Sequence, residues 1–188
     1  MTPLPEAAPG VPVHLVVMGV SGTGKTTIAG ALRDLLGWQF AEGDSYHPPE
    51  NVAKMAGGHP LTDEDRRPWL ETLRLWTAER DARGLPTILT CSALKRSYRD
   101  LLRGGGEGTF FVHLVGDKGL LLERMQHRPG HFMPPTLLES QLDTLQDLGT
   151  DERGMLMDVA NPPERIARMV LAQLDLGSER VQEPSEEL

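Results

Sequence analysis

The chain has 188 residues, a length that suits one domain with a sizeable core, and its 27 acidic residues outnumber 19 Lys and Arg residues to give a net charge of −8. This acidic balance argues against a nucleic-acid-binding surface, which usually carries a basic stripe. No apolar run approaches the roughly 18 residues that a membrane span requires, and the Pro-rich start, which has no Lys or Arg, does not have the pattern of a signal peptide.

Short apolar runs alternate with segments of helical spacing along the sequence. We expect strands at 13–19, 38–42, 87–92, 109–115 and 155–160, and helices at 25–37, 62–84, 93–103, 117–128 and 162–174. Strands that alternate with helices predict an α/β fold, in which a parallel sheet is covered by helices on both faces. The ends, 1–10 and 179–188, are expected to be disordered tails around one domain at 11–178.

The most specific motif is GVSGTGKT, which matches the P-loop pattern G-x-x-x-x-G-K-[ST] at every fixed position. It leaves a predicted strand and opens a predicted helix, whose N-terminus favours phosphate. Its glycines allow the backbone to turn N–H groups toward phosphate oxygens. Lys25 is expected to reach the β- and γ-phosphates of ATP, and the Thr26 hydroxyl to bind Mg²⁺. The predicted nucleotide-binding residues of this segment are Gly19, Ser21, Gly22, Thr23, Gly24, Lys25, Thr26 and Thr27.

Three classes of P-loop protein compete: a small-molecule kinase, a GTPase switch and a nucleic-acid-dependent motor ATPase. A GTPase requires the guanine-reading motif N-K-x-D, which the sequence lacks. A motor ATPase usually has an apolar strand that ends in a metal-binding Asp, whereas the strand at 87–92 ends in Cys91 and Ser92. A kinase therefore fits best.

Polar and charged residues crowd the stretch 43–69, which has no clean helix or strand period over most of its length. Asp44 follows the strand at 38–42, so we expect it at the carboxyl edge of the sheet, where open α/β sheets bind ligands. A carboxylate there is able to accept the proton of an attacking hydroxyl or to help hold Mg²⁺, although a Gly-Asp turn explains it equally well. Arg binds both oxygens of a carboxylate, so the donors of this stretch would suit an anionic acceptor; a solvated charged helix is the alternative. These donors are His47, Lys54, Arg66 and Arg67.

Three blocks of sequence are more specific than the P-loop: GDSYHPPENVAKMAGGHPLTDEDRRPWL, CSALKRSYRDLLR and RPGHFMPPTLLESQLDTLQ. Together they resemble the gluconokinases of the shikimate-kinase-like P-loop group, over roughly 13–176. The resemblance implies ATP- and Mg²⁺-dependent phosphorylation of D-gluconate to 6-phospho-D-gluconate. It also implies a three-layer P-loop kinase fold with a five-stranded parallel sheet, a mobile lid at about 124–135, and usually a homodimer. Shikimate or a nucleoside monophosphate is the alternative acceptor, and a nucleotide switch or motor is the disfavoured class.

The resemblance also implies roles for single residues. Asp44 is the candidate base, with Lys25 and Arg128 as the other catalytic residues. Arg124 and Arg128 lie four apart on one helix face, as lid arginines that close on the phosphates do, although a solvated helix end shows the same spacing. Arg124 is assigned to the nucleotide. The candidate substrate contacts are Asp44, His47, Arg66, Lys95, His131 and Gln141.

Other features predict structure rather than chemistry. Trp69, Leu73 and Trp76 follow helical spacing and predict a core or dimer stripe. The lone cysteine, Cys91, excludes an internal disulfide, suits a cytoplasmic location and is expected to be buried. Asn161 follows the last predicted strand, where similar kinases place a loop against adenine, although a turn before a helix explains it as well.

Overall fold

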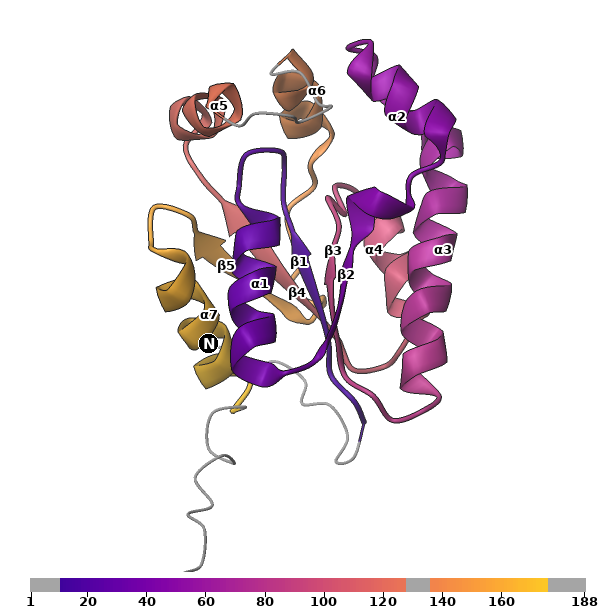
Figure 1. The fold of residues 1–188 in the computed structure, drawn as a ribbon, viewed down its shortest axis with the longest axis vertical. Coiled ribbons are helices and arrows are strands. Elements are labelled where there is room, and N and C mark those ends of the chain that lie inside the picture. The colour runs from indigo at the N-terminus through magenta and orange to yellow at the C-terminus, as the bar shows by residue number, and fades with distance from the viewer. Residues whose placement is uncertain (1–10, 128–135, 176–188) are drawn as a thin grey trace, which may run out of the picture.

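The structure is a computed structural model that describes residues 11–127 and 136–175 (Figure 1). The predicted tails, 1–10 and 179–188, lie outside the described residues. The same holds for most of the predicted lid, including Arg128 and His131.

In the described part of the chain, five parallel strands form one sheet in the order β2-β3-β1-β4-β5. The central strands are buried along almost their whole length, as expected for a parallel sheet covered on both faces. The predicted fold class is therefore confirmed. The strands are β1 (His14–Met18), β2 (Gln39–Glu42), β3 (Thr87–Thr90), β4 (Thr109–Val115) and β5 (Gly154–Asp158).

The described helices form two layers against the sheet and a group above its carboxyl edge (Figure 1). Helix α1 (Lys25–Leu36) packs beside α7 (Pro163–Gln173), and α3 (Asp63–Asp81) packs beside α4 (Arg96–Arg103) on the other side. The helices above the edge are α2 (Pro49–Ala56), α5 (Lys118–Gln126) and α6 (Thr136–Thr144), and a short 3₁₀ helix, η1 (Gly43–Tyr46), follows β2. None of the described helices is long and apolar enough to span a membrane.

Two of the described helices have clear capping residues. Thr62 accepts a hydrogen bond from the Asp65 N–H while the Asp65 carboxylate accepts one from the Thr62 N–H, which is a capping box at the start of α3. Gly37 ends α1 at φ 67°, a left-handed conformation that glycine adopts without steric cost.

Two predicted boundaries are corrected by the structure, and two helices were missed. Helix α4 begins at Arg96 instead of residue 93, because Ala93 takes a left-handed φ of 45°. The last strand ends at Asp158, whose carboxylate accepts a hydrogen bond from the Ala160 N–H and so starts a turn. Helices α2 and α6 were not predicted at all.

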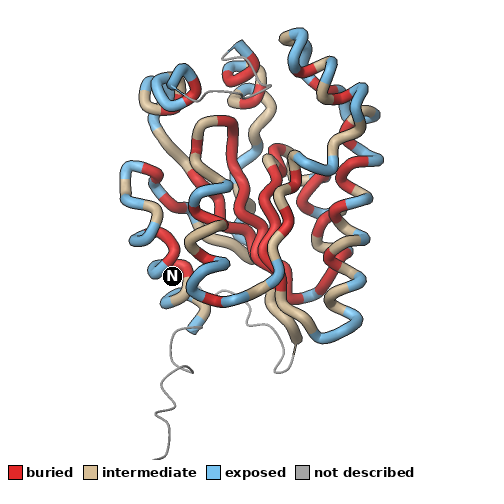
Figure 2. The backbone as a smooth tube through the Cα atoms, in the orientation of Figure 1, coloured by how far each residue is buried: buried red, intermediate tan, exposed pale blue. Residues whose placement is uncertain are grey.

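The core lies between the sheet and its flanking helices, whereas the helices above the carboxyl edge are mostly exposed (Figure 2). Trp69 and Leu73 are fully buried and Trp76 packs at the margin of the core, so this stripe belongs to the core. A second, smaller apolar cluster consists of Met55, Leu61 and Leu137. It joins α2 and the segment before α3 to α6, across the carboxyl edge of the sheet.

Candidate active site

The P-loop, Gly19–Thr26, forms the turn from β1 into α1. Three of its glycines have positive φ angles: 142° at Gly19, 84° at Gly22 and 84° at Gly24. A side chain at Gly19 or Gly22 would also come within 2.8 Å of a backbone carbonyl oxygen. Gly24 precedes the first residue of α1, so the N–H groups of the first helical turn are directed to the carboxyl edge of the sheet, where they favour a phosphate.

Lys25 is folded over this loop. Its Nζ donates hydrogen bonds of 3.1 Å to the carbonyl oxygens of Gly19 and Val20. The Thr23 hydroxyl also donates to the Val20 carbonyl, at 2.8 Å, and thereby fixes the loop from inside. Thr26 and Thr27 are exposed at the start of α1. Both the ammonium group and the Thr26 hydroxyl therefore lie where the loop backbone would hold phosphates.

A pocket adjoins the P-loop on the side of α7. Arg124 lies in it, with its guanidinium donating to the Val159 carbonyl oxygen at 3.0 Å. Asn161, from the turn after β5, is also part of the wall. Apolar side chains beside two polar ones suit a purine base. The lining residues are Thr23, Gly24, Thr27, Ile28, Arg124, Val159, Asn161, Pro163 and Ile166.

Asp44 lies in η1, directly after β2, at the carboxyl edge of the sheet. The turn depends on Gly43, whose N–H donates to the Thr90 hydroxyl at 3.0 Å and whose missing Cβ would lie 2.0 Å from the Thr90 carbonyl oxygen. Asp44 keeps 26% of its side chain exposed. A partly exposed carboxylate beside the end of β3 is accessible to a ligand.

His47 lies behind Asp44 rather than on an open surface. Its ring stacks on Trp69 with centroids 3.9 Å apart, and 2% of its side chain is exposed. Burial, together with the positive charge of Arg66, lowers the pKa of His47 to about 4, although the Asp44 carboxylate 3.9 Å away acts in the opposite direction. The ring is therefore neutral at neutral pH and acts as a packed support for Asp44.

Arg66 is the donor of this stretch that lines a pocket. The residue is 8% exposed, and its Nε has no hydrogen-bond partner among the described residues. Its guanidinium lies 5.7 Å from the centroid of the Tyr98 ring. A buried cation with an unused donor favours an anionic ligand, because that ligand would satisfy both the charge and the N–H group. The lining residues are Met55, Pro60, Leu61, Arg66, Leu137, Ser140, Gln141 and Thr144.

The other predicted donors are engaged elsewhere. Lys95 Nζ lies 2.8 and 2.9 Å from the two carboxylate oxygens of Asp63, which also accepts a hydrogen bond from the Tyr98 hydroxyl. Lys54 pairs with Asp65 at 2.5 Å. Arg67 lines a groove between α3 and α4 and is not part of the Arg66 pocket. Lys95 is thus paired at the N-terminus of α3, and its role as a substrate contact stays a prediction.

Cys91 directly follows β3 at the carboxyl edge of the sheet. It is buried, as predicted, and burial raises the pKa of its thiol to about 12. The charges of Asp44, Arg66 and Lys25 all act on this thiol. The candidate base and the P-loop therefore both lie at the carboxyl edge of the sheet, after β2 and after β1 respectively.

Comparison with known proteins identifies the family. The chain is 57% identical over 141 residues to a gluconokinase from Gluconobacter oxydans, and the aligned region covers 75% of this chain and 79% of that protein. It is 43% identical over 162 residues to the thermosensitive gluconokinase of Escherichia coli, covering 84% of this chain and 87% of that one. The chain belongs to the gluconokinase family. No family model matches it.

Solved structures agree with this membership. A gluconokinase from Sinorhizobium meliloti superposes with a TM-score of 0.77 at 49% identity, covering 88% of this chain and 93% of that one. A sugar kinase from a Janibacter species gives a TM-score of 0.84 at 52% identity, over 88% and 96% of the two chains. A shikimate kinase from Aquifex aeolicus, at 16% identity and a TM-score of 0.55, shares the fold alone. This gluconokinase is therefore a P-loop kinase in fold.

Sequence reasoning missed the apolar walls of both pockets in this gluconokinase. Ile28 and Ile166 beside the nucleotide pocket fall in helices whose spacing reads as core. Beside Arg66, Met55 and Leu137 come from two helices that were not predicted from the sequence, and Leu61 comes from the segment before α3. Gln141 was predicted as a substrate contact, but its side-chain oxygen accepts a hydrogen bond from the Ser21 N–H at 2.7 Å. In the sequence, Gln141 lies three and four residues after Leu138 and Leu137, which is the spacing of one helix face and was the available signal for its inward position.

Proposed function

We propose that this gluconokinase transfers the γ-phosphoryl group of ATP to the terminal hydroxyl of D-gluconate, giving 6-phospho-D-gluconate. The observation that carries the proposal is a buried Arg66 with an unpartnered Nε in a pocket, together with a P-loop and Asp44 at the carboxyl edge of the sheet, in a chain of this family. Shikimate and nucleoside monophosphates are the alternative acceptors for a P-loop kinase of this fold class. They are disfavoured because the full-length relatives that resemble the chain are gluconokinases.

Each part of the site has a role in this proposal. The P-loop N–H groups and Lys25 hold the phosphates and stabilise the charge that develops on them. Arg66 binds the gluconate carboxylate, since its buried guanidinium has an N–H available. Asp44 orients the attacking hydroxyl and accepts its proton. Arg124 and the apolar wall beside it receive the adenine.

Mg²⁺ fits this site as a metal that arrives with ATP. Within the described ranges, no three His, Cys, Asp or Glu side chains gather as a metal site. Mg²⁺ with a nucleotide needs only one or two protein oxygens, and the exposed Thr26 hydroxyl supplies one. When bound there with ATP, Mg²⁺ would neutralise charge on the phosphate oxygens. Asp44 is the other candidate for an indirect contact.

Several expectations stay predictions. Arg128 as a catalytic lid residue and His131 as a substrate contact fall outside the described residues. A homodimer and a cytoplasmic location are proposed from the family resemblance and the single buried cysteine. Light scattering after size-exclusion chromatography measures the first, and cell fractionation measures the second.

The activity is tested by an ADP-release assay with an acceptor panel. Gluconate is expected to support turnover with MgATP, and shikimate, AMP and single-stranded DNA are not. Turnover with AMP and none with gluconate would make the protein a nucleotide kinase. ATP hydrolysis that depends on DNA would move it to the motor class.

Two substitutions separate the roles of Asp44 and Arg66. Asp44→Asn keeps the shape but is unable to take a proton, so kcat is expected to fall by about 10²–10⁴ with the gluconate KM largely retained. Arg66→Ala loses a charge-assisted contact worth about 1.5–3 kcal/mol, so the gluconate KM is expected to rise about tenfold or more. Arg67→Ala is the matched control, because Arg67 neighbours Arg66 in the sequence but lines a different groove. An Arg66→Ala effect confined to the ATP KM would assign this pocket to the nucleotide.

A further inference from the structure

One hydrogen bond joins the P-loop to the helix on the far side of the cleft. The Ser21 backbone N–H donates to the Gln141 side-chain oxygen at 2.7 Å. Ser21 is 4% exposed and Gln141 is 7% exposed, so the contact is shielded from water. A hydrogen bond in such an environment is stronger and geometrically better defined than one at the surface.

The same glutamine lines the proposed acceptor pocket. Gln141 stands in the wall that also contains Arg66, the proposed carboxylate contact. One face of its side chain therefore borders the acceptor, while its oxygen holds an N–H group of the phosphate-binding loop. Gln141 therefore links the phosphate-binding loop to the wall of the proposed acceptor pocket.

Helix α6 is itself held in place at both ends. Near its start, Leu137 packs with Met55 and Leu61 in the small apolar cluster. After its end, the Gln146 N–H donates to the Leu94 carbonyl oxygen at 2.8 Å, and the Gln146 side-chain oxygen accepts from the Arg96 N–H, also at 2.8 Å.

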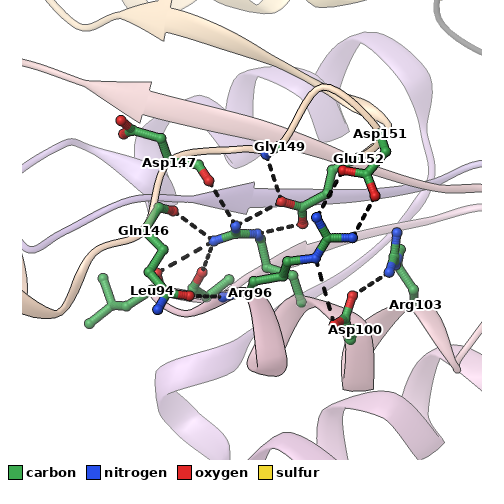
Figure 3. Close-up of polar contacts among 11 residues, drawn as sticks. Leu94, Arg96, Asp100, Arg103, Gln146, Asp147, Gly149, Asp151 and Glu152 are labelled. Atoms are coloured by element: carbon green, nitrogen blue, oxygen red, sulfur yellow. Dashed lines mark hydrogen bonds and ion pairs between the residues drawn. The ribbon is translucent and has the colours of Figure 1, made fainter.

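A buried arginine adds further support to the same segment. Arg99 donates to the Gln146 carbonyl oxygen at 2.9 Å and to the Asp147 carbonyl oxygen at 3.1 Å (Figure 3). The segment after α6 is thus tied to the turn between β3 and α4, which begins at Cys91. Gln141 consequently has a fixed position relative to the end of β3.

We propose that Gln141 is a positioning residue, which fixes the Ser21 amide of the P-loop relative to the acceptor pocket and so keeps the γ-phosphate in line with the acceptor hydroxyl. The inference rests on the proposed function and assigns Gln141 a role other than direct substrate binding. Its physical basis is that misplacement of reacting groups by about 1 Å costs on the order of a hundredfold in rate.

Two other roles for Gln141 predict different kinetics. A direct contact with gluconate would contribute equally before and during the reaction, so its loss would raise the gluconate KM and leave kcat nearly unchanged. A side chain that merely occupies the place of a phosphate oxygen would compete with ATP, so its loss would tighten nucleotide binding. A positioning residue instead affects kcat.

The test uses the full chain with Gln141→Met, which keeps the length of the side chain and removes the oxygen. With gluconate, kcat is expected to fall about 10- to 100-fold. The gluconate KM and the Kd of a non-hydrolysable ATP analogue are expected to change less than threefold. Asp143→Asn, on the exposed side of the same helix, is the control and is expected to match the parent.

Amide hydrogen exchange provides a readout that does not depend on the acceptor. The Ser21 amide is expected to exchange slowly in the parent and at least tenfold faster in Gln141→Met, while the Ile28 amide of α1 stays protected. Gln141→Glu keeps an acceptor oxygen, so Ser21 protection should persist, with a kcat between those of the parent and Gln141→Met. This second variant also keeps the test valid where Gln141→Met does not fold.

The outcomes separate this inference from the proposed function. Each of four outcomes overturns the role of Gln141. In the Gln141→Met variant these are a gluconate KM that rises as much as kcat falls, a lower Kd for the ATP analogue, or unchanged kinetics. In the parent it is a rapidly exchanging Ser21 amide. A parent without gluconate turnover overturns the proposed function alone. In that case kcat and KM are compared with the acceptor that supports turnover. The exchange rate of the Ser21 amide and the Kd of the ATP analogue are interpreted in the same way as above.

Discussion

The buried ion pair between Arg99 and Glu152 is expected to dominate the stability of the segment after α6. Both side chains are 0% exposed, and two hydrogen bonds of 2.7 and 2.8 Å join them (Figure 3). Glu152→Gln leaves the Arg99 charge buried without its counter-charge, which costs about 3–5 kcal/mol. For a chain of this size each kcal/mol lowers the melting temperature by about 2–4 °C, so we expect a drop of about 6–20 °C.

Calorimetry and urea denaturation of parent and variant measure this effect. The control is Asp151→Asn, which breaks the neighbouring pair with Arg96 at 2.6 Å. Arg96 and Asp151 are exposed, and solvent screens such pairs, so the shift should be several-fold smaller. A Glu152→Gln shift no larger than that of Asp151→Asn would refute the reasoning. So would a stable Arg99→Met/Glu152→Leu double variant, because Arg99 also satisfies backbone carbonyl oxygens that methionine leaves unpaired.

Three further predictions concern the phosphates and the buried side chains of His47 and His113. Lys25→Ala removes a charge that acts on the transferring phosphates, so kcat in the ADP-release assay should fall about a hundredfold to a thousandfold. Near-normal turnover of the folded variant would contradict the P-loop assignment. His113→Leu should raise the free energy of unfolding, measured by urea denaturation, by about 1–3 kcal/mol. The reason is that both His113 ring nitrogens are buried without a hydrogen-bond partner in the described part of the chain. A lower free energy of unfolding in the variant would contradict this reasoning. Burial lowers the pKa of His47 to about 4 and also lowers the pKa of His113 below the ordinary value of 6.5. Both rings are therefore neutral in the folded protein above about pH 6.5. The free energy of unfolding decreases as the pH falls from 6.5 toward 4, because the unfolded chain takes up protons more readily than the folded one. The urea midpoint should therefore decrease between pH 7 and pH 5, and His113→Leu should weaken that decrease.

The strands and the P-loop were predictable from the sequence because their signals are local. A run such as 14–18 is apolar throughout because both faces of a parallel sheet are covered. The P-loop glycines are required by backbone angles that other residues rarely adopt. Asp44 was predicted at the carboxyl edge from its position after β2, and the structure places it there.

The remaining features depend on contacts between distant segments. Ala93, Leu94 and Lys95 have good helix propensity, but Ala93 and Leu94 precede α4, and their carbonyl oxygens accept hydrogen bonds from the Arg99 guanidinium. Lys95 pairs with Asp63, which the sequence does not bring near it. Helix α6 has a polar residue, Gln141, on its buried side, so its periodicity was hidden. Such long-range pairings override local preferences and are visible only in the folded chain.

The burial of Cys91 has a practical consequence for experiments on this enzyme. The thiol is 1% exposed and its raised pKa leaves almost no thiolate at neutral pH, so maleimides and iodoacetamide should not modify the native protein. Because the sequence contains this one cysteine, the natural chain already serves as a silent background for site-specific labelling. A single cysteine introduced on an exposed position of α2 or α5 would then carry a fluorophore at one defined point. Movements of the helices above the cleft could be followed during turnover without removing any native residue.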